Sequence, residues 1–490
     1  MKREKAFFRQ FLTLLCFFFS CFLFAQNSAA QESNQFPSLE PIFSWETNGE
    51  LSGEDFIRAG LEFSLCPVES EAGHAILTQF KSLESEVNSE AFLALSEEAR
   101  GEKILSLMYE KVLKQYSLNQ TYIDSMFQKG TYNCVSSSIL YFALAKSAGL
   151  TVHGVETPNH AFCTLYLSDG RKIYVETTNP NGFNPGTKKD ISTANSKRYY
   201  VVPKKYYSNR KEVSELKFIS LIGKNVTAFL DEKQDYARSI PVAATRLAFT
   251  KGVNEADAKA VREDFDTATT NYAVSLDRKK KSDRALDWLD AVENRWGKGV
   301  SPVVQNLYDN IAYNAAVNLS KAEKSEQAKE LFEAKKGKIT AKKRLEIRNM
   351  IFYSIIDEKT KKMSPESAIS HIQQSRTEEE AKDASVAKKL DSLEEYYWSE
   401  RAKPLLTAKQ YLEAAALIDE GLQSLPKSRN LQTMKNQILN NYAVGIHNQF
   451  VDFFNAKDYE NAERIVKEGL EIVPKNGNLL RDLKTVQSRK

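Results

Sequence analysis

The chain of 490 residues is predicted to hold an α+β domain followed by an all-α solenoid of helical repeats. Two observations predict this fold class. Within residues 51–215 the apolar pattern has a helical period before Gly149 and an alternating period after it. From residue 216 to residue 490 the pattern is helical throughout, and segments of it repeat along the chain.

Residues 1–30 have the features of a secretory signal peptide. Basic residues up to Arg9 are followed by an apolar run from Phe11 to Ala25 and then by small residues, which predicts cleavage after Ala30. Residues 31–50 are polar and are expected to be a linker. We therefore expect an exported protein, periplasmic or extracellular, with no stable membrane span after cleavage. An uncleaved anchor, or a lipoprotein modified at Cys21, is the alternative.

Composition and charge exclude some functional classes. The chain is 42% hydrophobic and 27% charged, as folded proteins usually are. Its net charge is +4, of which the leader contributes +3 from four basic residues against one acid. The mature chain is therefore close to neutral, which argues against nucleic acid as a partner. The five histidines are scattered, so neither a metal site nor a cofactor is expected.

The first part of the α+β domain, from Phe56 to Tyr122, is predicted to be helical. The clearest apolar stripe runs from Glu102 to Tyr116 and is expected to pack against the next helix. It consists of Ile104, Leu105, Met108, Val112 and Leu113.

A cysteine begins that next helix. Cys134 follows Asn133, fourteen residues of helical composition follow, and Gly149 suits the left-handed end of a helix. The free N–H groups and dipole at a helix start favour a thiolate, the nucleophilic form of cysteine. The other interpretation is a small apolar residue that fills the core. Of the remaining cysteines, Cys66 and Cys163 could form a disulfide, which would leave Cys134 free.

A histidine follows at the start of a strand. The pattern predicts a strand at residues 151–156 and then a hairpin of residues 160–167 and 171–177, joined by the turn at residues 168–170. His160 is the first residue of the hairpin. A cysteine and a histidine oriented by a third polar group can activate a thiol.

The hairpin register decides the third group. With a three-residue loop and a left-handed Gly170, Glu176 lies opposite Phe162 on the same face as His160. With a two-residue loop the register slips by one, and Asn179 comes opposite His160 instead. We favour Glu176, because its carboxylate would hold the imidazole and stabilise its charged form, and we keep Asn179 as the alternative.

These segments resemble the transglutaminase-like superfamily, especially its bacterial members fused to tetratricopeptide (TPR) repeats. The resemblance rests on Asn133-Cys134 before the apolar helix, on Pro-Asn-His160-Ala-Phe-Cys and on Tyr-Val-Glu176-Thr-Thr. It implies a papain-like α+β core with Cys134 as nucleophile, His160 as base and then acid, and Glu176 as the orienting residue. Members of the family usually carry Asp at the position of Glu176.

Stabilisation of the oxyanion would come, by the same resemblance, from the backbone N–H of Cys134 and an upstream side chain. Gln128 and Tyr132 are the candidates for that side chain.

A basic and aromatic run lies between residues 187 and 212. It could hold a polyanion by charge and stacking. We favour a further strand at residues 199–202 with solvated lysines, because the mature chain is nearly neutral.

The second half repeats visibly. Residues 271–291 match residues 314–334, and residues 411–426 match residues 459–474. Each unit is predicted to be a long helix, a turn and a second helix with a close-packed alanine. This resembles TPR repeats with lengthened first helices, and stacked units of this kind offer a groove for a protein partner, although a spacer or dimerisation arm is equally compatible.

Together these features predict an exported thiol enzyme of residues 51–215 that acts on protein or peptide amides. It would be an amidase, peptidase or acyltransferase, releasing the acyl group to water or to an amine, with the repeats of residues 216–490 binding partner or substrate. The alternative is a catalytically inactive transglutaminase-like binding module on a TPR scaffold. A purely structural repeat protein is a third possibility.

Overall fold

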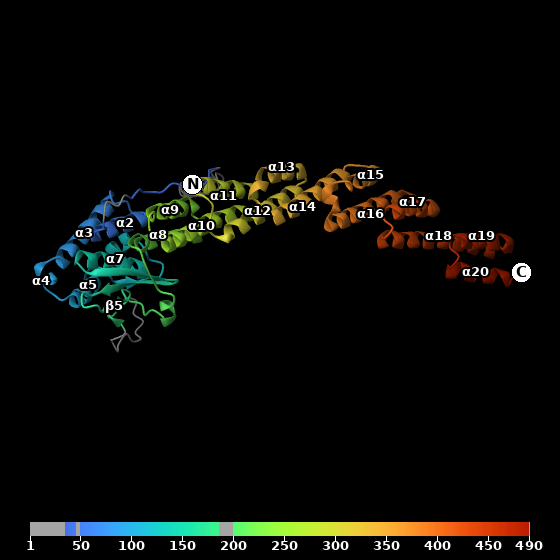
Figure 1. The fold of residues 1–490 in the computed structure, drawn as a ribbon. Coiled ribbons are helices and arrows are strands. Elements are labelled where there is room, and N and C mark those ends of the chain that lie inside the picture. The colour runs from blue at the N-terminus through green and yellow to red at the C-terminus, as the bar shows by residue number, and fades with distance from the viewer. Residues whose placement is uncertain (1–34, 46–49, 186–198, 490) are drawn as a thin grey trace, which may run out of the picture. The chain divides into compact units, whose positions relative to one another are not determined.

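The computed structural model describes residues 35–45, 50–185 and 199–489 (Figure 1). The chain forms two compact units. The first comprises residues 1–278 and 284–304, and the second comprises residues 279–283 and 305–490. The predicted signal peptide lies outside the described residues.

The first unit begins with a group of helices. Serines at positions 52, 70, 89 and 96 cap four of them by accepting a hydrogen bond from a backbone N–H of the first turn. The helices are α2 (Gly53–Phe63), α3 (Glu71–Val87), α4 (Glu90–Leu93), α5 (Glu97–Lys111), α6 (Ile123–Lys129) and α7 (Cys134–Ser147).

Four antiparallel strands form the sheet of this unit, in the order β5-β4-β3-β6. Their bounds are β3 (Thr151–Thr157), β4 (His160–Tyr166), β5 (Lys172–Val175) and β6 (Lys211–Val213). The predicted strand and hairpin are thus confirmed. A separate parallel pair consists of β1 (Gln115–Tyr116) and β2 (Thr131–Tyr132).

Helix α7 lies at the centre of the core. It is buried on all sides from Cys134 to Ala145, and it packs on α2, α5, β3 and β4. Gly149 has φ +69°, which confirms the predicted left-handed end of this helix. A helix surrounded in this way holds its first residue in a fixed place relative to the sheet.

Two predicted elements are wrong. The helix predicted up to Tyr116 ends at Lys111, and Tyr116 instead belongs to β1. Val112 and Leu113 are still buried, which explains why the apolar stripe seemed to continue. Residues 199–202 are not a strand. The backbone N–H of Tyr200 donates instead to the carbonyl of Thr178, and a 3-10 helix, η2 (Lys204–Tyr207), follows before β6.

The first compact unit extends beyond residue 215, where the sequence placed the boundary. It includes α8 (Glu215–Glu232), α9 (Tyr236–Phe249), α10 (Glu255–Arg278) and α11 (Ser282–Trp296). Phe218 of α8 belongs to the same core as α7 and lies against Gly154 of β3. The described part of the expected linker is also packed: the ring of Phe43 contacts Phe63, and Trp45 contacts Phe249.

The second unit is helical over its described residues. From α13 to α20 each helix packs on the next, and α14, α16, α18 and α20 also pack on one another in sequence. The helices are α12 (Pro302–Lys321), α13 (Ser325–Lys335), α14 (Ala341–Thr360), α15 (Pro365–Ser375), α16 (Ala384–Thr407), α17 (Tyr411–Ser424), α18 (Arg429–Asn455), α19 (Tyr459–Ile472) and α20 (Gly477–Gln487), with two 3-10 turns, η3 (Lys336–Lys338) and η4 (Glu379–Lys382).

One turn recurs between the paired helices. In five helix pairs a left-handed residue that is not glycine lies two positions before the second helix begins. These residues are Gln234, Lys280, Glu323, Lys409 and Lys457, with φ between 55° and 63°. The sequence repeats therefore coincide with a repeated backbone conformation, which we call the repeat turn.

Across the described ranges, no helix is both long and apolar enough to cross a membrane.

Candidate active site

Cys134 is the first residue of α7. Asn133 caps the helix: its side-chain oxygen accepts hydrogen bonds from the N–H groups of Val135 and Ser136 at 3.0 and 3.1 Å. The N–H of Cys134 itself has no hydrogen-bond partner among the residues that the structure describes. The cysteine is 9% exposed, so it lies at the edge of the core.

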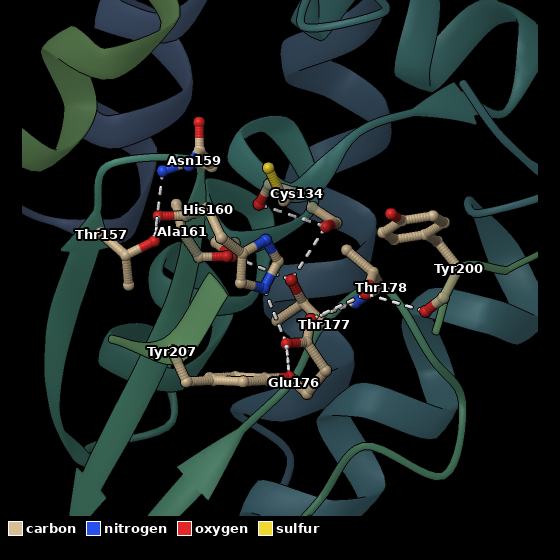
Figure 2. Close-up of polar contacts among 12 residues, drawn as sticks. Cys134, Thr157, Asn159, His160, Ala161, Glu176, Thr177, Thr178, Tyr200 and Tyr207 are labelled. Atoms are coloured by element: carbon tan, nitrogen blue, oxygen red, sulfur yellow. Dashed lines mark hydrogen bonds and ion pairs between the residues drawn. The ribbon is translucent and has the colours of Figure 1, made fainter. Parts of the chain in front are cut away.

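His160 starts β4 and faces that cysteine. Thr157 and His160 pair at the end of the β3–β4 hairpin, which fixes the backbone of the histidine. The side chain of Cys134 lies close enough to the imidazole to raise the pKa of His160. Because Nε2 contacts Glu176, Nδ1 is the ring nitrogen left for the cysteine. Figure 2 shows the imidazole between the cysteine and the carboxylate.

Glu176 completes this arrangement. The register of β4 and β5 pairs Cys163 with Val175, so Glu176 continues opposite Phe162 as the three-residue loop predicted. Gly170 has φ +86°, as that loop requires. Glu176 Oε2 lies 2.7 Å from His160 Nε2, and the two side chains are 7% and 2% exposed.

The backbone after Glu176 closes into a tight loop. The N–H of Glu176 donates to the carbonyl of Gly182 at 2.8 Å, and the N–H of Gly182 donates to the carbonyl of Asn179 at 2.9 Å. A Cβ atom at Gly182 would lie 1.9 Å from the carbonyl oxygen of Glu176. Only glycine fits there, so this loop places the backbone of the acid.

The structure places the other predicted candidates differently. Asn179 is buried, and its side-chain oxygen accepts from the N–H of Asn181 at 2.9 Å, whereas His160 contacts Glu176. Gln128 is exposed on α6. Tyr132 is fully buried, and its hydroxyl lies 2.9 Å from that of Tyr109. The structure therefore brings together Cys134, His160 and Glu176, and it leaves Gln128 outside the group.

Burial and charge shift the pKa values of His160 and Glu176 in opposite directions. Desolvation alone would lower the pKa of His160, but the Glu176 carboxylate and hydrogen bonds with Cys134 and Glu176 raise it from 6.5 to about 10. Desolvation likewise opposes ionisation of Glu176, yet His160, Tyr207 and Thr178 hold the pKa of its carboxyl below the ordinary 4.5. The favoured state is an ion pair of imidazolium and carboxylate.

The acid has two further partners that sequence analysis missed. Thr178 donates to Glu176 Oε1 from its backbone N–H at 3.1 Å and from its hydroxyl at 2.7 Å. The hydroxyl of Tyr207 donates to Glu176 Oε2 at 2.6 Å. Thr178 is two residues from the acid and could have been inferred as a local turn partner. Tyr207 is 31 residues away, and no periodicity indicated its contact.

Thr177 ties the acid to the cysteine helix. Its hydroxyl lies 2.8 Å from the hydroxyls of both Ser137 and Ser138 on α7, and its carbonyl accepts from Tyr109 at 3.0 Å. All of these groups are buried. Buried hydroxyls are costly to leave unpaired, so the network fixes the strand end against the helix.

Two stacked tyrosine rings lie near the cysteine. Tyr116 and Tyr200 stack with centroids 4.8 Å apart and planes at 9°. Desolvation raises the pKa of both phenols, and charge on Cys134 is among the further causes for each, so both stay neutral.

Cys66, Cys134 and Cys163 are all free, so the disulfide considered between Cys66 and Cys163 is not formed. Cys163 is fully buried, and its thiol donates to the carbonyl of Ser138 at 3.4 Å. Desolvation raises the pKa of both the Cys163 and the Cys66 thiol. In the described part of the chain, no group of three or more His, Cys, Asp or Glu side chains could hold a metal ion.

Comparison with known proteins agrees with this geometry. Residues 74–203 match the family model described as "Transglutaminase-like superfamily", and this range contains Cys134, His160 and Glu176. The chain thus contains a transglutaminase-like domain, followed by a mostly helical remainder.

No curated protein matches the chain. Among solved structures, the crystal structure of menin, whose title reports the binding site for the Mixed Lineage Leukemia (MLL) protein, matches at 13% sequence identity. The match covers 80% of this chain and 92% of menin with a TM-score of 0.27, too low to support a conclusion about fold or function.

Proposed function

We propose that the protein is a thiol enzyme of the transglutaminase-like class that acts on protein or peptide amides. The observation that carries this proposal is the position of His160, whose ring lies between Cys134 and Glu176 (Figure 2) and meets the Glu176 carboxylate at 2.7 Å. A nucleophile, a base and an orienting acid in this order form the arrangement that activates a thiol.

The chemistry follows from these positions. The Cys134 sulfur attacks the amide carbonyl carbon, a C–S bond forms, and the thiol proton resides on His160. His160 gives that proton to the leaving nitrogen as the C–N bond breaks, which leaves a thioester. Water or an amine then attacks the thioester carbonyl carbon and loses a proton to His160. The C–S bond breaks, the acid or the new amide leaves, and the proton on His160 returns to the Cys134 sulfur. The free N–H of Cys134 is the backbone donor for the oxyanion.

Thiol labelling tests this proposal. The full chain is treated with iodoacetamide at pH 6, and peptide mapping by mass spectrometry gives a separate rate for each cysteine. We expect Cys134 to react about tenfold or more faster than a model thiol, because the imidazolium stabilises the thiolate. The His160→Ala variant should lose this advantage.

His153→Ala is the matched control, because His153 lies on neighbouring β3 with a side chain 47% exposed. A Cys134 no faster than a model thiol, or unaffected by His160→Ala, would refute the enzyme and favour the inactive binding module.

We further propose that the helical repeats bind the protein partner or substrate. The repeat turn and the successive packing from α13 to α20 support a stacked array like that of TPR proteins. A cavity of about 400 Å³ in the second unit is lined by apolar side chains, including Phe332 and Ile351. Charged side chains, including Lys329 and Arg348, also line it. Partners captured by the full chain should be lost from Ile355→Arg, which alters this lining, and retention of every partner would argue against the role.

Export is proposed from the leader alone. The test is the N-terminal residue of the protein recovered from its producing cell, where we expect the chain to begin at Gln31. A chain that retains residues 1–30 would contradict cleavage.

A further inference from the structure

The carboxylate of Glu176 depends on its neighbours for its position. A glutamate side chain has several rotatable bonds, and an ion pair requires the carboxylate to stay in one place. Thr178 holds Oε1 through two hydrogen bonds, but both come from the same local turn as the acid. The oxygen that faces the histidine, Oε2, receives its second hydrogen bond from Tyr207.

Tyr207 reaches this oxygen from outside the hairpin. It is the last residue of η2, whose N-cap is Pro203, and it precedes β6. Its ring also packs edge-on against His160, with centroids 5.8 Å apart at 80°, and against Phe162 at 5.6 Å and 66°. Figure 2 shows the phenol reaching the carboxylate while His160 approaches the same group from the cysteine side. One side chain therefore contacts both members of the pair.

We propose that Tyr207 is the positioning residue of this site, which holds Glu176 Oε2 in line with His160 and covers the edge of the imidazole. It acts through Glu176 and does not touch the reacting atoms. Only the catalytic consequence of this positioning rests on the proposed function. The hydrogen bonds and ring contacts hold whatever the chemistry is.

The other groups that face the pair do not replace Tyr207. His160 from β4 is the partner itself, and Cys134 from α7 lies on the far side of the ring. Cys163 and Tyr116 interact with Glu176 electrostatically, and burial raises the pKa of each, so both are neutral near pH 7. The pKa of Tyr207 is raised as well, by desolvation and by the carboxylate, so its hydroxyl remains a donor.

The test measures the titration of His160 by NMR on the full chain with isotope-labelled histidine. The chain has five histidines, and the signal of His160 is identified by its absence from His160→Ala. Without the hydroxyl that holds it, Glu176 Oε2 moves off the line to the imidazole, so Tyr207→Phe should lower the pKa of His160 by about one unit. The neighbouring Tyr206→Phe is the matched control, because the ring of Tyr206 lies against Lys205, and it should leave the titration unchanged.

A second measurement separates positioning from general damage. In the Glu176→Gln background, Tyr207→Phe should cause no further shift, because the hydroxyl acts through the carboxylate. If the phenylalanine variant does not fold, Tyr207→Met removes the hydroxyl with an apolar side chain and should shift the titration at least as far. A wild-type titration in either variant, or an equal shift with and without Glu176, would overturn the proposal.

Failure of this inference is distinguishable from failure of the proposed function. If Cys134 proves unreactive while Tyr207→Phe still shifts His160, the enzyme proposal falls and the positioning role stands. If Cys134 reacts fast while Tyr207→Phe leaves His160 unchanged, the enzyme stands and the positioning role falls.

Discussion

Glu176→Gln is the substitution that tests the buried pair most directly. It keeps the size of the side chain and removes its charge, so the packing around His160 should change little. In the native chain the two side chains are 2% and 7% exposed, and solvent therefore screens their attraction weakly.

The magnitude follows from the titration of His160. Its pKa is raised from 6.5 to about 10, so the folded state gains stability that is complete below pH 6.5 and is lost as the pH rises through 10. At about 1.4 kcal/mol per unit, this amounts to about 4 kcal/mol at pH 7. Part of it belongs to the hydrogen bond with Cys134. We therefore expect Glu176→Gln to lower the free energy of unfolding by about 3 kcal/mol at pH 7.

The carboxyl group of Glu176 sets the lower end of the pH range in which the ion pair stabilises the fold. Its pKa is lowered below 4.5, so its contribution is present above that pH and is lost as the pH falls through the folded-state value. The difference between wild type and Glu176→Gln should thus be large near neutrality and smaller above pH 10 and in acid.

Urea unfolding at pH 7 and at pH 10.5 measures this difference. Glu212→Gln is the control, because it breaks an exposed pair with Lys172 at 2.6 Å and should cost less than about 1 kcal/mol. An equal loss at both pH values would show that shape rather than charge matters, and no loss at pH 7 would refute the ion pair.

Three further predictions concern backbone positions. Gly182→Ala should destabilise the fold by about 3 kcal/mol, because its Cβ would meet the Glu176 carbonyl at 1.9 Å, and an unchanged melting temperature would contradict the tight loop. Gly154→Ala should cost about 1–3 kcal/mol in urea unfolding, since its Cβ would lie 2.2 Å from the Phe218 ring, and wild-type stability would mean that α8 packs elsewhere. Lys457→Val should destabilise by about 1–2 kcal/mol and Lys457→Gly should not, because φ is +63°; thermal unfolding that ranks them the other way would disprove the left-handed turn.

Local patterns predicted the elements around the site. The helix after Asn133 and the strand that begins at His160 follow from periodicity and from residues with strong preferences such as Gly149 and Gly170. The register of the hairpin was open to a one-residue slip, because both loop lengths accept a glycine at that place. The structure has the register that puts Glu176 beside His160.

What the sequence could not provide are contacts between distant segments. Tyr132 was considered as an oxyanion donor because of its nearness to Cys134, but the parallel pairing of β1 and β2 buries it beside Tyr109. Tyr207 lies in the basic and aromatic run beyond the strand predicted at residues 199–202, and only its contact with Glu176 shows its place. Such contacts depend on the path of the whole chain, which no local preference determines.

Because each repeat turn has the same backbone conformation, one turn can be exchanged for another between the two helices of a pair. Lys409 and Lys457 occupy the same backbone conformation, and each is followed by one residue and then a tyrosine that begins α17 or α19. Excision of residues 411–458 would join Gln410 directly to Tyr459, so that a repeat turn is again followed by one residue and then by a tyrosine that begins a helix. The length of the array can therefore change by whole units, through deletion or duplication, and each new connection between helices is again a repeat turn.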